Sequence, residues 1–270
     1  MPKAATQYDP VVDLNRTAVK SVPKINKITV EDLMDVIARG LSDFKQKPSH
    51  IILLVVIYPI IGLLAARMAA GYDIIPLVFP IVTGFALLGP IAALGMYELS
   101  RRREKGMSLA WRHVFNICHS PAIGSISALG ILLTVIFLVW LVTALMLFKT
   151  IFGTTEITSI GVFISQVLTT PAGWNLILIG CGVGFIFAVV VLSISVISFP
   201  MLLDKDISAA LAVQTSVKVV ITNPIPIMVW GAIVAGSMLV GSIPFFVGLC
   251  VVMPVLGHST WHLYRKVVAE

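Results

Sequence analysis

The stretch VEDLMDVIARGLSDFKQKPSHIILLVVIYPIIGLLAARM, residues 30–68, decides the fold because it joins an amphipathic segment, a proline and a long apolar run. In its first part, apolar residues recur every three or four positions, as on one face of a helix. Pro48 disfavours helix in the residue before it, and the run from Ile51 is long enough to cross a bilayer. The same order recurs twice, with amphipathic segments at 107–119 and 207–221 and prolines at 121 and 224.

The composition indicates a membrane protein. Hydrophobic residues make up 58% of the 270 residues and charged residues only 12%, whereas soluble domains carry about 25% charged residues. We therefore predict an all-α, polytopic membrane helical bundle with six transmembrane helices in three hairpins, each hairpin preceded by a cytoplasmic amphipathic helix. The expected spans cover about residues 50–68, 74–98, 124–148, 174–199, 225–242 and 244–264.

The first part of the chain differs from the rest. Residues 1–28 contain no apolar run and several basic residues, so we expect a disordered basic N-terminal arm there, followed by the membrane domain over residues 29–270. Such an arm would be attracted to anionic lipid headgroups, although a solvated tail fits the same composition.

The basic residues predict the orientation. If the N-terminus lies inside, all of the 19 Lys and Arg residues except Arg67 and Lys149 fall on the inner side. This asymmetry follows the positive-inside rule, so both termini are expected in the cytoplasm and the protein in a bacterial inner (plasma) membrane. An apolar segment at 155–170, between the third and fourth spans, is then expected on the outer face.

The amphipathic segments are candidate surfaces for the lipid bilayer or for a partner protein. In the third segment we expect an apolar face of Ile207, Leu211, Val217 and Ile221 opposite Ser208, Gln214, Thr215 and Lys218. Helices that seal the bundle at headgroup level are the alternative to a docking surface. The candidate surface residues are Leu33, Ile37, Leu41, Phe44, Arg101, Arg102, Arg103, Trp111 and Phe115.

The ends of the second and sixth spans match each other. Tyr97 follows Pro90 at the same spacing at which Trp261 follows Pro254, and basic residues come after each aromatic residue. Aromatic residues beside basic anchors are typical of a membrane interface. The equal spacing favours a repeated hairpin, while shared membrane constraints would produce a similar pattern by chance.

Ionisable residues are absent from the middle of the expected spans, which counts against a proton-coupled pump. Glu98 lies at a span end and is expected to pair with Arg101 or Arg102, one turn further along the helix. His258 and His262 share one helix face and are weak candidates for a metal site, but no carboxylate or cysteine lies near them in sequence.

Catalytic and cofactor motifs are also missing from the sequence. Cys118, Cys181 and Cys250 are isolated, so we expect neither a disulfide framework nor a cysteine-ligated metal. We therefore expect no enzymatic activity, no catalytic residue, no cofactor and no nucleic-acid partner.

Three segments carry a resemblance to a known family: VEDLMDVIARGLSDFKQKPSH, GPIAALGMYELSRRREKG and the following SLAWRH. From about Val30 onward, the chain resembles a bacterial family of predicted integral membrane proteins of unknown function, some labelled as cytochrome c oxidase proteins. The residues speak against a catalytic core of that kind, which needs several buried histidines and clustered cysteines. The resemblance therefore implies at most an accessory subunit.

Two functions fit these observations. The first is a non-catalytic accessory or scaffold subunit of a larger membrane complex, such as a respiratory one. The second is a carrier or binder of lipid or another small apolar molecule, which the proline-broken spans and their hydroxyl-bearing faces favour.

Overall fold

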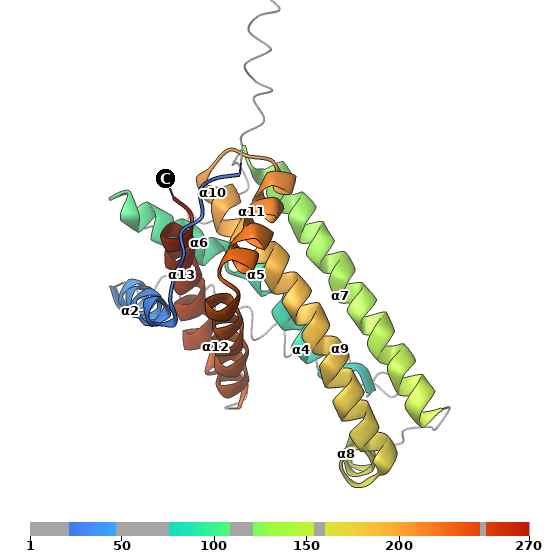
Figure 1. The fold of residues 1–270 in the computed structure, drawn as a ribbon. Coiled ribbons are helices and arrows are strands. Elements are labelled where there is room, and N and C mark those ends of the chain that lie inside the picture. The colour runs from blue at the N-terminus through green and yellow to red at the C-terminus, as the bar shows by residue number, and fades with distance from the viewer. Residues whose placement is uncertain (1–21, 47–75, 109–120, 154–159, 244–246, 270) are drawn as a thin grey trace, which may run out of the picture.

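The computed structural model describes residues 22–46, 76–108, 121–153, 160–243 and 247–269, and every regular element in these ranges is a helix. An isolated antiparallel bridge joins Ile25 to Val268. The expected all-α class is therefore confirmed for the described chain (Figure 1). The elements are α2 (Val30–Gln46), α4 (Val78–Phe85), the 3₁₀ helix η2 (Ala86–Leu88), α5 (Gly89–Ala92), α6 (Leu94–Glu104), α7 (Ile123–Phe152), α8 (Ile160–Thr169), α9 (Pro171–Ser195), α10 (Ser198–Asp204), α11 (Ala209–Thr222), α12 (Pro224–Ser242) and α13 (Leu249–Val267).

Four stretches of the described chain are long and apolar enough to cross a membrane: Phe79–Glu104, Ile123–Phe152, Pro171–Asp204 and Pro224–Ser242. They correspond to the second, third, fourth and fifth expected spans. The expected span at 50–68 and residues 109–120 of the second amphipathic segment lie outside the described residues. The sixth expected span forms α13, which is not among the four stretches. Six spans in three hairpins therefore stay a prediction.

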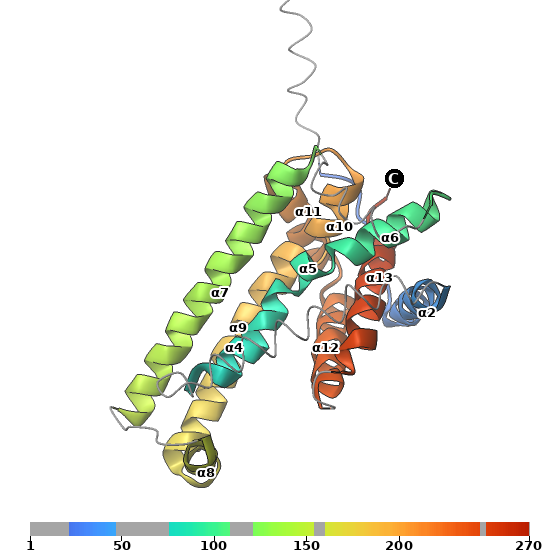
Figure 2. The ribbon, with the colours of Figure 1, turned by 180° about the vertical axis from the view of Figure 1, so that it is seen from behind.

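The long helices α7 and α9 run side by side in opposite directions (Figures 1 and 2). Helix α8 lies at one end of this pair, and α10 and α11 lie at the other. Helix α13 packs against α2 and α6 and lies beside α12. The ends of α6, α10 and α13 are thereby brought together, and these ends build the site described below.

Prolines divide the second expected span into short helices. Pro90 lies in the first turn of α5, where its missing N–H and its ring are incompatible with a continuous α-helix through Ala86. The chain forms the 3₁₀ turn η2 at this point. Trp140 of α7 donates its indole Nε1–H to the carbonyl oxygen of Pro80, 3.0 Å away, so a neighbouring helix supports the broken one.

Helix α7 has one buried stripe and one broad exposed face. The stripe packs into the bundle, and Trp140 in its centre fills the space beside Gly84 and Gly184, where a larger residue would clash or crowd the indole. The exposed face carries apolar side chains, as expected of a helix whose outer side contacts lipid acyl chains. The stripe consists of Ile126, Leu129, Leu133, Trp140, Ala144 and Phe148, and the exposed face includes Val135, Leu138, Val142 and Met146.

Thr215 departs from the predicted faces of the third amphipathic segment. It was assigned to the polar face but is fully buried in α11, whereas Ile221 of the apolar face is 73% exposed. Thr215 satisfies its hydroxyl by donating to the Leu211 carbonyl at 2.8 Å, and Ser216 accepts from the Ile197 N–H at 3.3 Å. Small hydroxyl residues allow close helix packing, so these two side chains face the bundle, while Ser208, Gln214 and Lys218 of the same segment stay exposed.

The aromatic residues that end the second and sixth spans are not interfacial anchors. Tyr97 is 3% exposed and Trp261 is fully buried, because both lie where α6 packs against α13. Met96 occupies the space beside Gly257 at the same contact. The matched aromatic positions therefore belong to the protein core, and the hairpin repeat that they suggested stays a prediction.

Residues 22–28, the last part of the expected N-terminal arm, lie within the described chain. Residues 1–21 lie outside the described chain, but the last residues of the arm are held in place. The Asn26 N–H donates to the Val267 carbonyl, and the Ile28 N–H donates to Asn223 Oδ1, both at 2.9 Å. Asn223 also donates from Nδ2 to the Asn26 carbonyl at 3.1 Å. One buried side chain between α11 and α12 thus fixes the segment that leads into α2.

The contact between α2 and α13 predicts the effect of one substitution. A Cβ atom at Gly40 would lie 2.7 Å from the backbone nitrogen of Ser259, which cannot move without shifting α13. We expect Gly40→Ala to lower stability by about 1–3 kcal/mol, measured as thermal unfolding in detergent. The control is Gly124→Ala at the start of α7, where a Cβ meets open space. Equal stability of the two variants would contradict the close packing of α2 on α13.

Candidate functional site

Two carboxylates join the ends of α6, α10 and α13. Glu104 of α6 accepts from Trp261 Nε1 at 3.0 Å and from Arg265 Nε at 2.9 Å. Asp204 of α10 accepts from the Tyr264 hydroxyl at 2.9 Å and pairs with Lys105 at 3.3 Å and with Arg265 at 3.5 Å. We call Glu104, Asp204 and these partners the hub. It ties together the C-terminal ends of the second, fourth and sixth expected spans.

Glu98 extends the hub along α6. It is almost fully buried and pairs with Arg101 at 2.9 Å and with Arg102 at 3.5 Å, so the expected local pairing is confirmed. Arg101 also donates from Nη1 to the Leu203 carbonyl at 2.8 Å and so reaches the end of α10. Arg101, which the positive-inside rule counts as a membrane anchor, thus also connects α6 to α10.

Helix α2 lies across α13 and is joined to it by ion pairs. Lys266 Nζ lies 2.9 Å from both Asp32 and Asp35. The hydrogen bond that Lys266 donates to Asp32 and, to a smaller extent, the one that it donates to Asp35 raise the pKa of Lys266 above its ordinary value. Asp32 also closes the first turn of α2 by accepting from the Thr29 N–H at 2.8 Å, as the Thr29–Asp32 spacing predicts.

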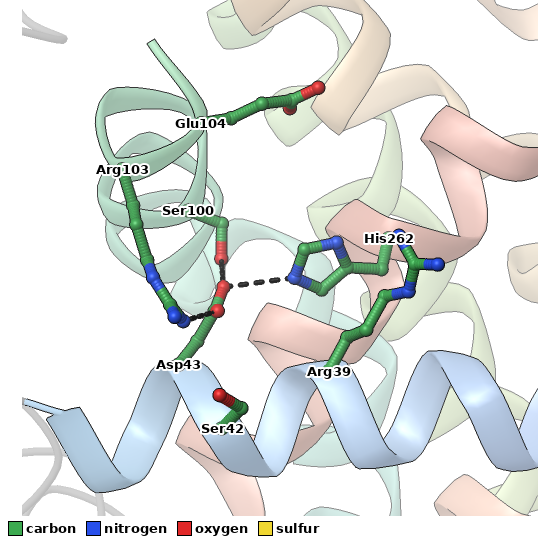
Figure 3. A pocket seen from close by; sticks show the side chains of 7 residues that line it. All are labelled: Arg39, Ser42, Asp43, Ser100, Arg103, Glu104 and His262. Atoms are coloured by element: carbon green, nitrogen blue, oxygen red, sulfur yellow. Dashed lines mark hydrogen bonds and ion pairs between the residues drawn. The ribbon is translucent and has the colours of Figure 1, made fainter. Parts of the chain in front are cut away.

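A second set of polar side chains lies further along the contact between α2, α6 and α13 (Figure 3). Asp43 of α2 is 8% exposed and forms an ion pair with Arg103 of α6. Its Oδ2 accepts from the Ser100 hydroxyl at 2.6 Å and lies 2.9 Å from His262 Nε2. Ser100 Oγ in turn lies 2.6 Å from Nδ1 of His258, which is buried. We call these five residues the Asp43 cluster.

The hydrogen bonds assign the tautomers of the two imidazoles. Since the Ser100 hydroxyl donates to Asp43, it accepts from His258, whose proton then resides on Nδ1. This leaves a lone pair on His258 Nε2, the atom that is buried without a hydrogen-bond partner among the described residues. His262 donates from Nε2 to Asp43. Asp43 therefore collects the donors of both other helices.

The carboxyl group of Asp43 is held in its charged form. Burial favours the neutral acid, but the hydrogen bonds from His262 and Ser100 together with the nearby positive charge outweigh it, and the pKa of Asp43 lies below its ordinary value. A buried carboxylate with this many donors positions helices strongly, because removing it leaves those donors unsatisfied.

A pocket of about 310 Å³ opens beside the Asp43 cluster. Its wall combines side chains of α2, α6 and α13 (Figure 3). The volume corresponds to roughly ten water molecules at about 30 Å³ each. The lining residues are Arg39, Ser42, Asp43, Ser100, Arg103, Glu104 and His262.

The candidate surface residues lie in different environments. Leu33 is 1% exposed and belongs to the core, so its assignment to a surface is wrong. Ile37 and Phe44 are half-buried against the core, while Leu41 is exposed. Trp111 and Phe115 lie outside the described residues. The three arginines, Arg101, Arg102 and Arg103, make the intramolecular contacts given above, and Arg102 also donates to the Ser108 carbonyl.

The structure adds a carboxylate to the two histidines that sequence spacing singled out. His258 and His262 lie on one face of α13, as expected, and Asp43 lies between them and α6. In the described part of the chain, however, no group of three or more such side chains could hold a metal ion. The sequence signal for Asp43 was its position: it follows Leu33, Val36 and Gly40 on the buried side of α2.

These features define a helical protein of the multi-pass integral membrane class. Residues 78–204, from α4 to α10, match the sequence model of a family described as predicted integral membrane protein (DUF2189). The expected resemblance is confirmed over these residues. No curated protein and no solved structure matches the chain. The matched region contains Ser100, Arg103, Glu104 and Asp204, whereas Asp43 and both histidines lie outside it.

The Asp43 cluster predicts a dependence of stability on pH. Because the folded-state pKa of Asp43 is depressed, its contribution is present above the unfolded-state pKa of about 3.9 and is lost as the pH falls through the folded-state value. Asp43→Asn should therefore cost about 1–3 kcal/mol at pH 7, and its unfolding midpoint should change less between pH 6 and pH 3 than that of the wild type. Lys45→Gln, which changes one charge on the exposed side of α2, is the control. A parallel acid dependence of wild type and Asp43→Asn would exclude this role.

Proposed function

We propose that the protein is a non-catalytic, six-span protein of a bacterial inner membrane that serves as an accessory or scaffold subunit of a larger membrane complex, such as a respiratory one. The observation that carries this proposal is the placement of α2. This helix lies outside the four candidate spans, is fixed to α13 and α6 by Gly40, Asp43 and Lys266, and turns its other side outward.

The outward side of α2 carries apolar side chains. Met34 is 69% exposed, and Val30 and Leu41 are exposed as well. A helix held rigidly by its neighbours loses little conformational freedom when its free side binds a partner, so such a surface suits docking. The hub adds rigidity, because its ion pairs join the helices that carry α2.

The arrangement of the described helices supports the proposed topology. Helices α7, α9, α12 and α13 alternate in direction, and α11 and α8 lie at opposite ends of the α7–α9 pair (Figures 1 and 2). With α8 on the outer face, the hub and both chain termini belong to the cytoplasmic side. The remaining crossings are assigned to residues 50–68 and to α13.

A second candidate function is the binding or carriage of lipid or another small apolar molecule. The pocket beside the Asp43 cluster and the proline-broken helices α4 to α6 favour it. The two functions differ in what stays bound on purification: a stoichiometric protein in the first case, a small molecule alone in the second.

The topology predicts which sites are reached from each side of the membrane. In a background with all three cysteines replaced by serine, Ser165→Cys on α8 should react with an impermeant maleimide on spheroplasts. Lys218→Cys on α11 should react only after the membrane is permeabilised. Both positions are exposed, so burial does not obscure the comparison. The opposite labelling pattern would contradict the cytoplasmic placement of the hub.

The accessory role predicts a partner that depends on α2. Purification in mild detergent followed by mass spectrometry should recover a stoichiometric membrane-protein partner. Met34→Gln should lower its recovery about tenfold, the loss expected when one buried methionine contact is removed. The matched control is Met146→Gln on the outer face of α7, with 64% exposure. Recovery of the wild type only as a lone monomer would exclude the proposal.

A further inference from the structure

The pocket beside the Asp43 cluster has a distinctive inventory of hydrogen-bond donors and acceptors. Two carboxylates and two guanidinium groups line it, so its formal charges balance. Their hydrogen bonding differs. Every carboxylate oxygen already accepts a hydrogen bond, whereas each guanidinium group has N–H groups without an acceptor among the described residues.

Both carboxylates are already bound from within the protein. Asp43 uses Oδ1 for Arg103 and Oδ2 for Ser100 and His262. Glu104 uses Oε1 for Arg265 and Oε2 for Trp261. A molecule that enters the pocket therefore meets no carboxylate oxygen that lacks a donor, which disfavours a cationic ligand.

The guanidinium groups retain donors. Arg39 uses only Nε, for Asp35, and Arg103 uses only Nη1, for Asp43, so their other N–H groups have no partner among the described residues. Ser42 lines the pocket together with these two arginines, and its hydroxyl likewise has no partner in the described chain. Three side chains from two helices thus offer donors to one space, and such a set suits an acceptor with several oxygens.

The surroundings of the pocket favour a negatively charged ligand. The pocket lies beside the hub, at the end of the bundle where the basic residues of α6 and α13 gather. Anionic lipids give the cytoplasmic leaflet, the side proposed for the hub, a negative surface potential, so anionic headgroups are available there. The volume of about 310 Å³ leaves room for a phosphate group and its substituent.

We infer that this pocket binds the phosphate group of a net-anionic ligand through Arg39, Arg103 and Ser42. The Arg39 side chain is 63% exposed and lies on the open side of the site, whereas Arg103 is held by its ion pair with Asp43. Phosphatidylcholine is disfavoured, because its quaternary ammonium group would lie beside two guanidinium groups and find no carboxylate oxygen that lacks a donor. The inference concerns a ligand of this chain and is independent of whether a protein partner docks on α2.

The test is native mass spectrometry of the full chain, delipidated in detergent and titrated with phosphatidylglycerol, with phosphatidylcholine for comparison. We expect one phosphatidylglycerol to bind more tightly than phosphatidylcholine. Arg39→Gln should weaken that binding about tenfold or more, as expected when a charged donor is lost. Lys45→Gln is the matched control, because it removes one charge from the exposed side of the same helix outside the pocket.

Competition with glycerol phosphate and with inorganic phosphate identifies the source of the ligand. Displacement of phosphatidylglycerol by these soluble anions would assign the site to small phosphate compounds, and its absence would assign it to the lipid headgroup. Ser42→Ala gives a variant whose folding is not at risk and should weaken binding in the same assay. Equal binding by wild type and Arg39→Gln, or an equal loss in Arg39→Gln and Lys45→Gln, would overturn the inference.

Discussion

The structure depends on two carboxylates, Glu104 and Asp204, that hold the ends of three helices together. Glu104 of α6 accepts from two side chains of α13, and Asp204 of α10 binds side chains of α13 and Lys105 at the end of α6. Ion pairs in such partly dehydrated places are stronger than those in water. Lipid-facing helices gain little from the hydrophobic effect inside a bilayer, so specific polar contacts determine how they associate. The hub supplies such contacts at one end of the bundle. Farther away, Trp140 fills the space between α4, α7 and α9 and donates a hydrogen bond to α4.

Helix α2 completes this arrangement from outside the candidate spans. Its buried side combines a position without a side chain, Gly40, with an acidic one, Asp43. Gly40 allows the backbones of α2 and α13 to approach closely. Asp43 then binds side chains of α6 and α13. A pocket lies where the three helices diverge, and it is lined by side chains that make these contacts or lie next to them. The same residues thus explain how α2 is held and why a ligand site lies beside it.

The sequence predicted the helical class, four of the spans that the described chain contains and the Glu98 pairing, because hydropathy and helical spacing act locally. It did not predict the inward side of α11 or the burial of Trp261. Hydropathy measures preference for an apolar environment but does not distinguish lipid from protein interior, so it could not predict that Thr215 is buried while Ile221 is exposed. The burial of Asp43 was not predicted either, because its partners lie on α6 and α13, far along the chain.

The pairing of residues 24–26 with residues 266–269 has a consequence for biosynthesis. Helix α2 is synthesised early. The hydrogen bond between Asn26 and Val267 and the ion pair between Lys266 and Asp35, which hold it in place, can form only after α13 has been synthesised. Contacts of such large sequence separation form late, because the intervening chain must first be inserted. The contacts of α2 with α13 therefore form only after α13 has been synthesised, whereas its contact with α6 through Asp43 and Arg103 joins segments that are closer in sequence.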